Sequence, residues 1–230
     1  MDTQIEHTAV PHERPVSGGV VTFACMAGFP PAVIFPFTPA ERYGTRSIYD
    51  FQMLMYRPLY WYGRRGALDI DYDLSLGREP EWEPDGRTCT VRVKPWKWSN
   101  GETVCADNVM LFMHMLSRKR TRFGLYVEGY FPDNLVSYEK VADDAVRFTF
   151  DKVYSKRWVE LNQLTMITPF PKAWDRTVGG PADASHDPDQ VEAVYDFLMA
   201  ENGNMVGVVR RVGLGGRAAR SGAWSMDRGG

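Results

Sequence analysis

Residues 80–116 read PEWEPDGRTCTVRVKPWKWSNGETVCADNVMLFMHML, and the fold class can be deduced from them. Residues 88–94 alternate between polar and apolar side chains, as in a strand that buries one face. The polar positions are Thr88, Thr90, Arg92 and Lys94, and the apolar ones are Cys89, Val91 and Val93. Residues 99–102 (SNGE) then predict a tight polar turn, so a strand and a turn lead into the next element.

An amphipathic helix is predicted directly after this turn, in residues 103–120 (TVCADNVMLFMHMLSRKR). Asp107 lies near its start, where the carboxylate is expected to cap free N–H groups, and the basic end suits the negative pole of the helix dipole. His114 is expected to be a partly buried residue of this helix rather than a ligand. The apolar residues recur at helical spacing, at Val109, Phe112, Met113 and Leu116.

Both kinds of element continue toward the C-terminus. Residues 136–154 predict two short strands on either side of Asp143 and Asp144, which is the pattern of a β-hairpin. Residues 156–174 predict a helix, a short strand and a proline-bounded turn, and residues 190–200 predict another amphipathic helix. The two adjacent carboxylates point in different directions on a turn, so a solvated turn is favoured over acid–base chemistry.

The segments upstream are richer in proline and apolar residues. Residues 67–98 are expected to be β structure, and residues 47–60 to form a buried helix or helix–turn that ends at its proline. Four prolines in residues 30–44 exclude a long helix and predict a rigid packed loop. The apolar run Val20–Ala24 predicts a short strand.

The composition is that of a globular protein and excludes several classes. A chain of 230 residues makes one large domain or two small ones, and a net charge of -2 gives no reason to expect nucleic acid or an anionic membrane as partner. Aromatic residues form 13% of the chain, which favours a large core over a ligand cleft as the explanation. The cysteines and histidines lack metal-binding spacing, so neither zinc nor a disulfide framework is predicted. They are Cys25, Cys89, Cys105, His7, His12, His114 and His186.

No pattern in the chain predicts catalysis. It contains no GxSxG elbow, no P-loop and no dinucleotide-binding fingerprint, and no nucleophile is accompanied by a base. We therefore expect no catalytic residue, no cofactor and no bound metal. A hydrolase that uses Asp143 or His114 is the enzyme hypothesis that remains, and it ranks last.

The stretch quoted first resembles the signature of solute-binding protein family 5, the oligopeptide, dipeptide and nickel binders of ABC importers. The family pattern is a tryptophan, an Asp-Gly turn, a strand with a basic end, Trp-Ser-Asp-Gly, a threonine, and Ala-Asp-Asp/Asn-Val opening a helix. Asn100 replaces the usual aspartate, and segments of family type on both sides extend the resemblance over about residues 18–206. The matches in order are Trp82, Asp85–Gly86, Val91–Lys94, Trp98–Gly101, Thr103 and Ala106–Val109. Trp98 is expected to pack beside the following helix.

The resemblance implies an α/β fold of the periplasmic-binding-protein type II kind, of which this chain supplies the N-terminal part only. We expect residues 1–17 to be a disordered tail, 18–44 to begin lobe one, and 45–170 to form the extra mixed α/β domain. Residues 171–206 would return incompletely to lobe one. Residues 207–230 are rich in glycine and arginine, and we expect them to be the frameshifted tail of a truncated member. With one choice of codons, the shifted frame spells Val-Val-Asp-Gly-Pro-Trp, as the family does.

The resemblance also implies where a ligand would lie. In the family, the loop after the first strand contributes to the peptide cleft between lobe one and the C-terminal lobe, and here this loop is residues 35–42. Aromatic residues in the connection after the helix can face the same cleft. For each position, packing in the loop, the core or the surface is the alternative explanation. The candidate ligand-binding residues are Phe35, Phe37, Thr38, Glu41, Arg42, Tyr126 and Tyr130.

The functional hypothesis is therefore the substrate-binding component of an ABC importer, for peptides, without its C-terminal lobe. Its partners would be a peptide or similar small solute and the permease subunits, with no nucleic acid, and the protein would be a monomer. The implied location is periplasmic or extracellular and membrane-associated, although the first 19 residues contain no apolar stretch of signal-peptide type. The alternative is an inert truncated fragment that binds no ligand.

Overall fold

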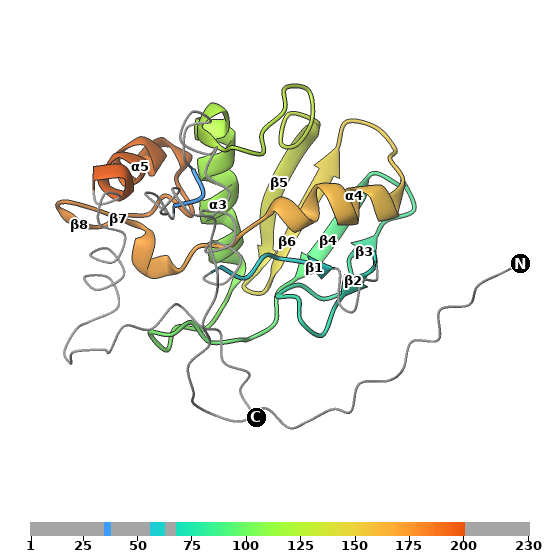
Figure 1. Cartoon of the computed structure of the whole chain (residues 1–230), viewed down its shortest axis with the longest axis horizontal. Coiled ribbons are helices and arrows are strands. Elements are labelled where there is room, and N and C mark those ends of the chain that lie inside the picture. Colours follow the sequence, from blue (N-terminus) through green and yellow to red (C-terminus); the bar gives the residue numbers. More distant parts are fainter. Residues whose placement is uncertain (1–34, 38–55, 63–67, 201–230) are drawn as a thin grey trace, which may run out of the picture.

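The structure is a computed structural model that describes residues 35–37, 56–62 and 68–200, and its architecture is mixed α/β, as predicted (Figure 1). The main sheet has four antiparallel strands in the order β3-β4-β6-β5. Two small antiparallel sheets, β1-β2 and β7-β8, lie outside it. The strands are β1 (Trp61–Tyr62), β2 (Ile70–Asp71), β3 (Glu81–Trp82), β4 (Thr88–Arg92), β5 (Leu135–Ala142), β6 (Ala145–Phe150), β7 (Arg176–Thr177) and β8 (Gly180–Pro181).

Helices cover the main sheet and extend the fold to one side. α3 contacts β5 and β6 as well as α5, so it lies between the main sheet and α5 (Figure 1). α4 lies beside β3, as shown by the 3.0 Å hydrogen bond that the indole Nε1 of Trp82 in β3 donates to the carboxylate of Glu160 in α4. The α-helices are α3 (Ala106–Lys119), α4 (Lys156–Asn162) and α5 (Val191–Ala200). The 3-10 helices are η2 (Arg120–Arg122), η3 (Leu164–Met166), η4 (Lys172–Trp174) and η5 (Pro188–Gln190).

The predicted strand and hairpin form the centre of the main sheet. β4 pairs with β6 over the whole length of β4, and β5 and β6 form the hairpin whose turn is Asp143 and Asp144. Val91 of β4 and Phe148 of β6 are buried, so one face of these strands supplies core residues. The β structure expected over residues 67–98 is present as the separate strands β2, β3 and β4.

The turn before α3 closes as the sequence predicts. Gly101 has a φ of 88°, a backbone conformation that favours glycine, and its N–H donates to the carbonyl of Trp98 at 2.8 Å. Trp98 is buried, and its indole Nε1 donates to the side-chain oxygen of Asn108 at 3.3 Å. The expected packing of Trp98 beside α3 is therefore confirmed.

Asn108, and not Asp107 as expected, caps the start of α3. Its Oδ1 accepts a 2.8 Å hydrogen bond from the backbone N–H of Cys105, while its Nδ2 donates to the carbonyl of Phe170 at 2.8 Å. The carboxylate of Asp107 instead forms an ion pair with Lys140 of β5, at 2.8 Å. The side-chain amide of Asn108 can accept one hydrogen bond through its oxygen and donate another through its nitrogen, whereas an ionised carboxylate can only accept.

The segment that follows the hairpin differs in part from its prediction. α4 confirms the expected helix, but the short strand expected within residues 156–174 is absent, and the chain continues as the 3-10 helix η3. The hydroxyl of Thr165 donates to the carbonyl of Leu161 at 2.8 Å, and the N–H of Met166 donates to Gln163 at 3.0 Å. These local bonds hold the backbone in helical turns. α5 confirms the helix expected over residues 190–200.

The N-terminal predictions can be compared with the structure only in part. The helix or helix–turn expected over residues 47–60 is described from residue 56 onward, and residues 56–60 are not helical. The N–H of Leu59 instead bonds to the carbonyl of Ile167 at 2.7 Å, a partner far along the chain. The strand Val20–Ala24 and the tails at residues 1–17 and 207–230 lie outside the described residues.

Candidate functional site

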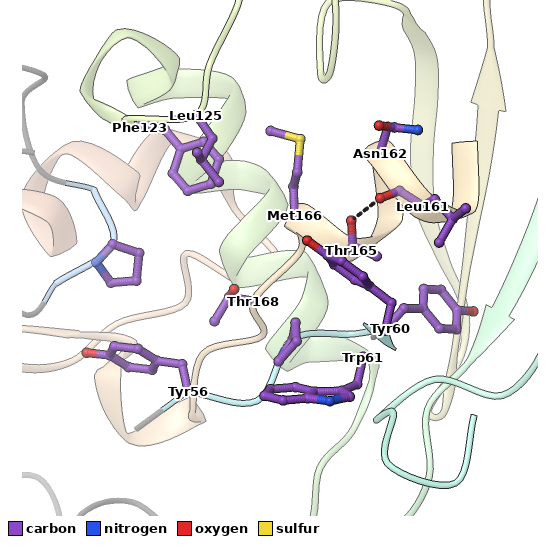
Figure 2. A pocket seen from close by; sticks show the side chains of 13 residues that line it. Tyr56, Tyr60, Trp61, Phe123, Leu125, Leu161, Asn162, Thr165, Met166 and Thr168 are labelled. Atoms are coloured by element: carbon purple, nitrogen blue, oxygen red, sulfur yellow. Dashed lines mark hydrogen bonds between the residues drawn. The ribbon is translucent and has the colours of Figure 1, made fainter. Parts of the chain in front are cut away.

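An aromatic pocket of about 530 Å³ lies between residues 56–62, the end of α4 with η3, and the connection after η2. This volume falls in the range of about 300–1,000 Å³ that is typical of small-molecule sites. Figure 2 shows Tyr56 and Trp61 on one side of the open space and Phe123 and Leu125 on the opposite side. The lining residues are Pro36, Tyr56, Pro58, Tyr60, Trp61, Tyr62, Phe123, Leu125, Leu161, Asn162, Thr165, Met166 and Thr168.

Backbone hydrogen bonds hold residues 56–62 in place along the pocket. Leu59 is bonded on both sides, through its N–H to Ile167 at 2.7 Å and through its carbonyl to the N–H of Gly77 at 2.9 Å. Gly77 also makes room for the ring of Tyr60, since a Cβ atom at Gly77 would lie 2.9 Å from that ring. The hydroxyl of Tyr60 then donates to the carbonyl of Arg78 at 2.6 Å. One wall of the pocket is therefore fixed by contacts on both of its edges.

The walls of the pocket are largely apolar. Tyr62 and Leu125 are 47% and 44% exposed, so both offer apolar surface to a ligand. The guanidinium of Arg57 lies over the ring of Trp61, 4.8 Å from its centroid, which brings a positive charge near this wall. The hydroxyl of Thr165 is occupied by the carbonyl of Leu161 (Figure 2). This arrangement can bind apolar and aromatic groups by contact and stacking.

Tyr56 has an unusual environment for a tyrosine. Its hydroxyl is buried and has no hydrogen-bond partner among the residues that the structure describes, and its ring meets that of Trp174 edge to face, with 5.9 Å between centroids. Burial raises the pKa of Tyr56 far above its ordinary value of 10.0, because the phenolate would lose its hydration. The Tyr56 hydroxyl therefore stays neutral, and it contributes no charge to the pocket.

Two of the predicted site residues, Phe35 and Phe37, are fully buried, with 0% exposure. Their rings belong to one aromatic cluster, in which Phe35 lies 5.7 Å from Phe170 and Phe37 lies 5.5 Å from Phe112. Pro36, the residue between them, lines the pocket. Thr38, Glu41 and Arg42 lie outside the described residues. A ligand contact by any of these side chains stays a prediction.

The other two predicted residues, Tyr126 and Tyr130, lie in the connection between η2 and β5. Tyr126 is half-buried, and its hydroxyl donates to Asp133 at 2.7 Å, which raises the pKa of Tyr126. Tyr130 is 55% exposed. Neither residue lines the aromatic pocket, although Leu125, next to Tyr126, does. Their role in ligand binding also stays a prediction.

Four aromatic residues that line the pocket, Tyr56, Tyr60, Trp61 and Tyr62, are not among the ligand-binding residues predicted from the sequence. All four come from one short segment, YRPLYWY, of which residues 56–60 fall in the predicted buried helix or helix–turn. The signal present in the sequence is the density of aromatic residues around a proline, which is unusual for a helix and suits an extended wall.

Solved structures similar to this chain include an ABC-transporter substrate-binding protein. Neither the models of protein families nor the curated proteins give a match. Among solved structures, CtaP from Listeria monocytogenes, an ABC transporter substrate-binding protein, is 26% identical with a TM-score of 0.48, over 66% of this chain and 28% of that one. NikA from Brucella suis, in complex with Fe(III)-EDTA, is 24% identical with a TM-score of 0.48, over 66% of this chain and 29% of that one.

A third structure is the oligopeptide-binding protein AppA from Bacillus subtilis, in complex with a nonapeptide. It is 22% identical with a TM-score of 0.44, over 57% of this chain and 25% of that one. The chain is similar to ABC-transporter substrate-binding proteins. The matched region spans little more than a quarter of the length of these proteins, since the covered shares are 28%, 29% and 25%.

The residues of the hydrolase hypothesis lie away from the aromatic pocket. The Nδ1 atom of His114 is 2.7 Å from the carbonyl of Ala184, and burial lowers the pKa of His114. The side chain of Asp143 is fully exposed and forms an ion pair with Lys140 at 3.1 Å. Neither residue is placed beside a partner that would make it a nucleophile or a base toward a ligand in the pocket.

Within 35–37, 56–62 and 68–200, no group of three or more histidine, cysteine and acidic residues is placed to hold a metal ion. Across the same part of the chain, none of the helices combines the length and apolar character needed to cross a bilayer. Cys89 is buried, and desolvation, with the charge of Glu160, raises the pKa of its thiol to about 12, so it is a packing residue.

Proposed function

We propose that this chain belongs to the solute-binding component of an ABC importer and that the aromatic pocket forms one wall of its ligand site. The observation behind the proposal is the pocket itself, about 530 Å³ in volume and walled by Tyr56, Tyr60, Trp61 and Tyr62. Such a surface binds ligands through contact with rings and supplies no group for bond breaking. The resemblance of residues 80–116 to family 5 supports the same role.

Peptides are the class of ligand that we propose for this wall. A peptide presents apolar side chains at intervals, and aromatic rings accept them without strong preference for one side chain. Charged groups that would hold the peptide termini are expected in parts of the site outside the described residues. AppA, one of the similar structures, holds a nonapeptide, whereas NikA holds Fe(III)-EDTA, so other small solutes are the alternative ligand class.

The division into lobes is part of the same proposal. Residues 18–44 would begin lobe one, 45–170 would form the extra domain, and 171–206 would return to lobe one. The ring of Phe35, in the proposed start of lobe one, packs against Trp174 at 5.9 Å and Tyr195 at 6.5 Å, which belong to the proposed return. It also packs at 5.7 Å against Phe170, the last residue of the proposed extra domain, so one aromatic cluster would join all three parts. The working protein would be a monomer that delivers its ligand to permease subunits in the periplasm or outside the cell.

Binding of the tripeptide Ala-Phe-Ala to the full chain, measured by calorimetry, tests this function. Trp61→Leu should weaken binding about tenfold, because an aromatic contact contributes about 0.5–1.5 kcal/mol beyond its buried area. Trp158→Leu is the matched control, since Trp158 stacks on Tyr154 at 5.5 Å and does not line the pocket. Equal affinities of the two variants would contradict the proposed site. No binding by the unaltered chain would favour the inert fragment.

A further inference from the structure

A second, smaller pocket has charged side chains of both signs on its walls. Its volume is about 220 Å³, and it is lined by Glu102, Lys172, Ala173, Asp175, Arg176 and Pro181. It shares no lining residue with the aromatic pocket. Arg176 and Pro181 belong to β7 and β8, which lie across α3 from β1 and α4 (Figure 1). The two pockets are therefore separate sites.

Glu102 is one of the two acidic residues that line this pocket. Its backbone is held by the turn after β4, since its N–H donates to the side chain of Asn100 at 3.0 Å and its carbonyl accepts from Trp98 at 2.8 Å. Its Oε2 atom is buried and has no hydrogen-bond partner within residues 35–37, 56–62 and 68–200. A buried carboxylate oxygen without a donor is destabilising, so a cationic donor at this position would be stabilised.

Asp175 lines the same pocket but has its partners within the chain. Its two carboxylate oxygens accept 2.8 Å hydrogen bonds from the backbone N–H groups of Ala184 and Ser185. Asp175 therefore fixes the loop at Ala184, and Glu102 is the carboxylate that remains to bind a ligand.

Arg176 is the corresponding basic group. Its Nε atom is buried without a hydrogen-bond partner, and its guanidinium lies over the ring of Phe197, 5.6 Å from the centroid. Within the part of the chain that the structure describes, no carboxylate lies within ion-pair distance of Arg176. The planar fork of an arginine is suited to bind a carboxylate through two donors. Lys172, which is more exposed, adds a second positive charge at the same pocket.

Glu102 and Arg176 also form no ion pair with each other, although both line one small pocket. We propose that this pocket binds a small zwitterion of the α-amino-acid class, with its ammonium group at Glu102 and its carboxylate at Arg176. A ligand with only one charge would leave the other protein group unpaired. The pocket is smaller than the about 300–1,000 Å³ of sites for drug-sized ligands, so the ligand must be small.

Calorimetric titration of the full chain with L-alanine tests the proposal. L-Lactate lacks the ammonium group and L-alaninamide lacks the carboxylate, so both should bind at least about tenfold more weakly than L-alanine. Glu102→Gln and Arg176→Met should weaken L-alanine binding by a similar factor. Methionine keeps an aliphatic contact with Phe197, and glutamine keeps the shape of Glu102, so both variants should fold.

Trp61→Leu serves as the matched control, because Trp61 lines the other pocket and its loss should leave L-alanine binding unchanged. This control also separates the present proposal from the proposed function, since each pocket has its own ligand and its own variant. Absence of L-alanine binding up to its solubility limit would overturn the proposal. Equal binding of L-alanine and L-lactate, or unchanged affinity in Glu102→Gln, would overturn it as well.

Discussion

Replacing Asn108 by alanine removes the side chain that joins the turn, α3 and the segment at Phe170. Asn108 is 1% exposed and makes three hydrogen bonds, to Trp98 at 3.3 Å, to Cys105 at 2.8 Å and to Phe170 at 2.8 Å. Each such bond contributes about 0.5–1.5 kcal/mol net, so Asn108→Ala should lower the free energy of unfolding by about 3 kcal/mol. That is a large share of the roughly 5–15 kcal/mol typical of a domain.

Urea unfolding followed by circular dichroism measures this loss. With a urea dependence of about 1–3 kcal/mol per molar, the midpoint should fall by roughly 1 M or more. Asn108→Asp keeps both accepted bonds but loses the donor to Phe170 and buries a carboxylate beside that carbonyl, so it should also lower the urea midpoint. Asn100→Ala is the matched control, because Asn100 lies in the neighbouring turn and its side chain accepts a hydrogen bond from the N–H of Glu102 at 3.0 Å. If Asn108→Ala and Asn100→Ala unfold at the same urea concentration, the reasoning about Asn108 is refuted.

Three further predictions concern single side chains. Tyr56→Phe removes a buried hydroxyl that has no partner, so stability in urea should stay the same or rise by about 1 kcal/mol; a clear fall would contradict this. Gly77→Ala places a Cβ atom 2.9 Å from the ring of Tyr60 and should cost about 1–3 kcal/mol, and an unchanged midpoint would show that the ring can move. Burial lowers the pKa of His114 below its ordinary value of 6.5, because the charged imidazolium would lose its hydration. The neutral imidazole therefore contributes to the free energy of unfolding above pH 6.5, and this contribution is lost as the pH falls through the folded-state pKa. His114→Gln should flatten that part of the pH profile of the melting temperature, and an identical profile would count against it.

Local sequence patterns predicted the elements whose partners are near in the chain. The hairpin of β5 and β6 follows from two short predicted strands and the turn at Asp143 and Asp144, and α3 follows from helical spacing between Val109 and Leu116. In both patterns, apolar side chains recur at a regular spacing because one face of the strand or helix is buried. This spacing can be recognised from a short run of neighbouring residues. The capping residue of α3 was assigned to Asp107 instead of Asn108, since both are good capping residues and only the structure shows which one reaches the N–H of Cys105.

The aromatic pocket could not be derived in this way. Leu59 is held by Ile167 and Gly77, and neither partner can be recognised from the sequence around residue 59. Phe35 lies in a proline-rich segment, but its burial depends on Phe170 and Trp174, which lie far along the chain. Long-range contacts of this kind decide which aromatic residues become core and which line a cavity, and residue type alone does not separate the two.

The bond between Leu59 and Ile167 has a consequence for the order in which the molecule assembles. A contact between residues so far apart in the chain closes a long loop. Closing this loop lowers the conformational entropy of the chain, and this loss must be offset before the contact gives any net stabilisation. During synthesis, which proceeds from the N-terminus, Leu59 has to wait until Ile167 has left the ribosome. The pocket wall formed by Tyr60 and Trp61 is therefore expected to reach its native structure late in folding, after the hairpin and α3 have formed from local contacts. Ligand binding at this wall would then mark molecules in which folding has reached completion.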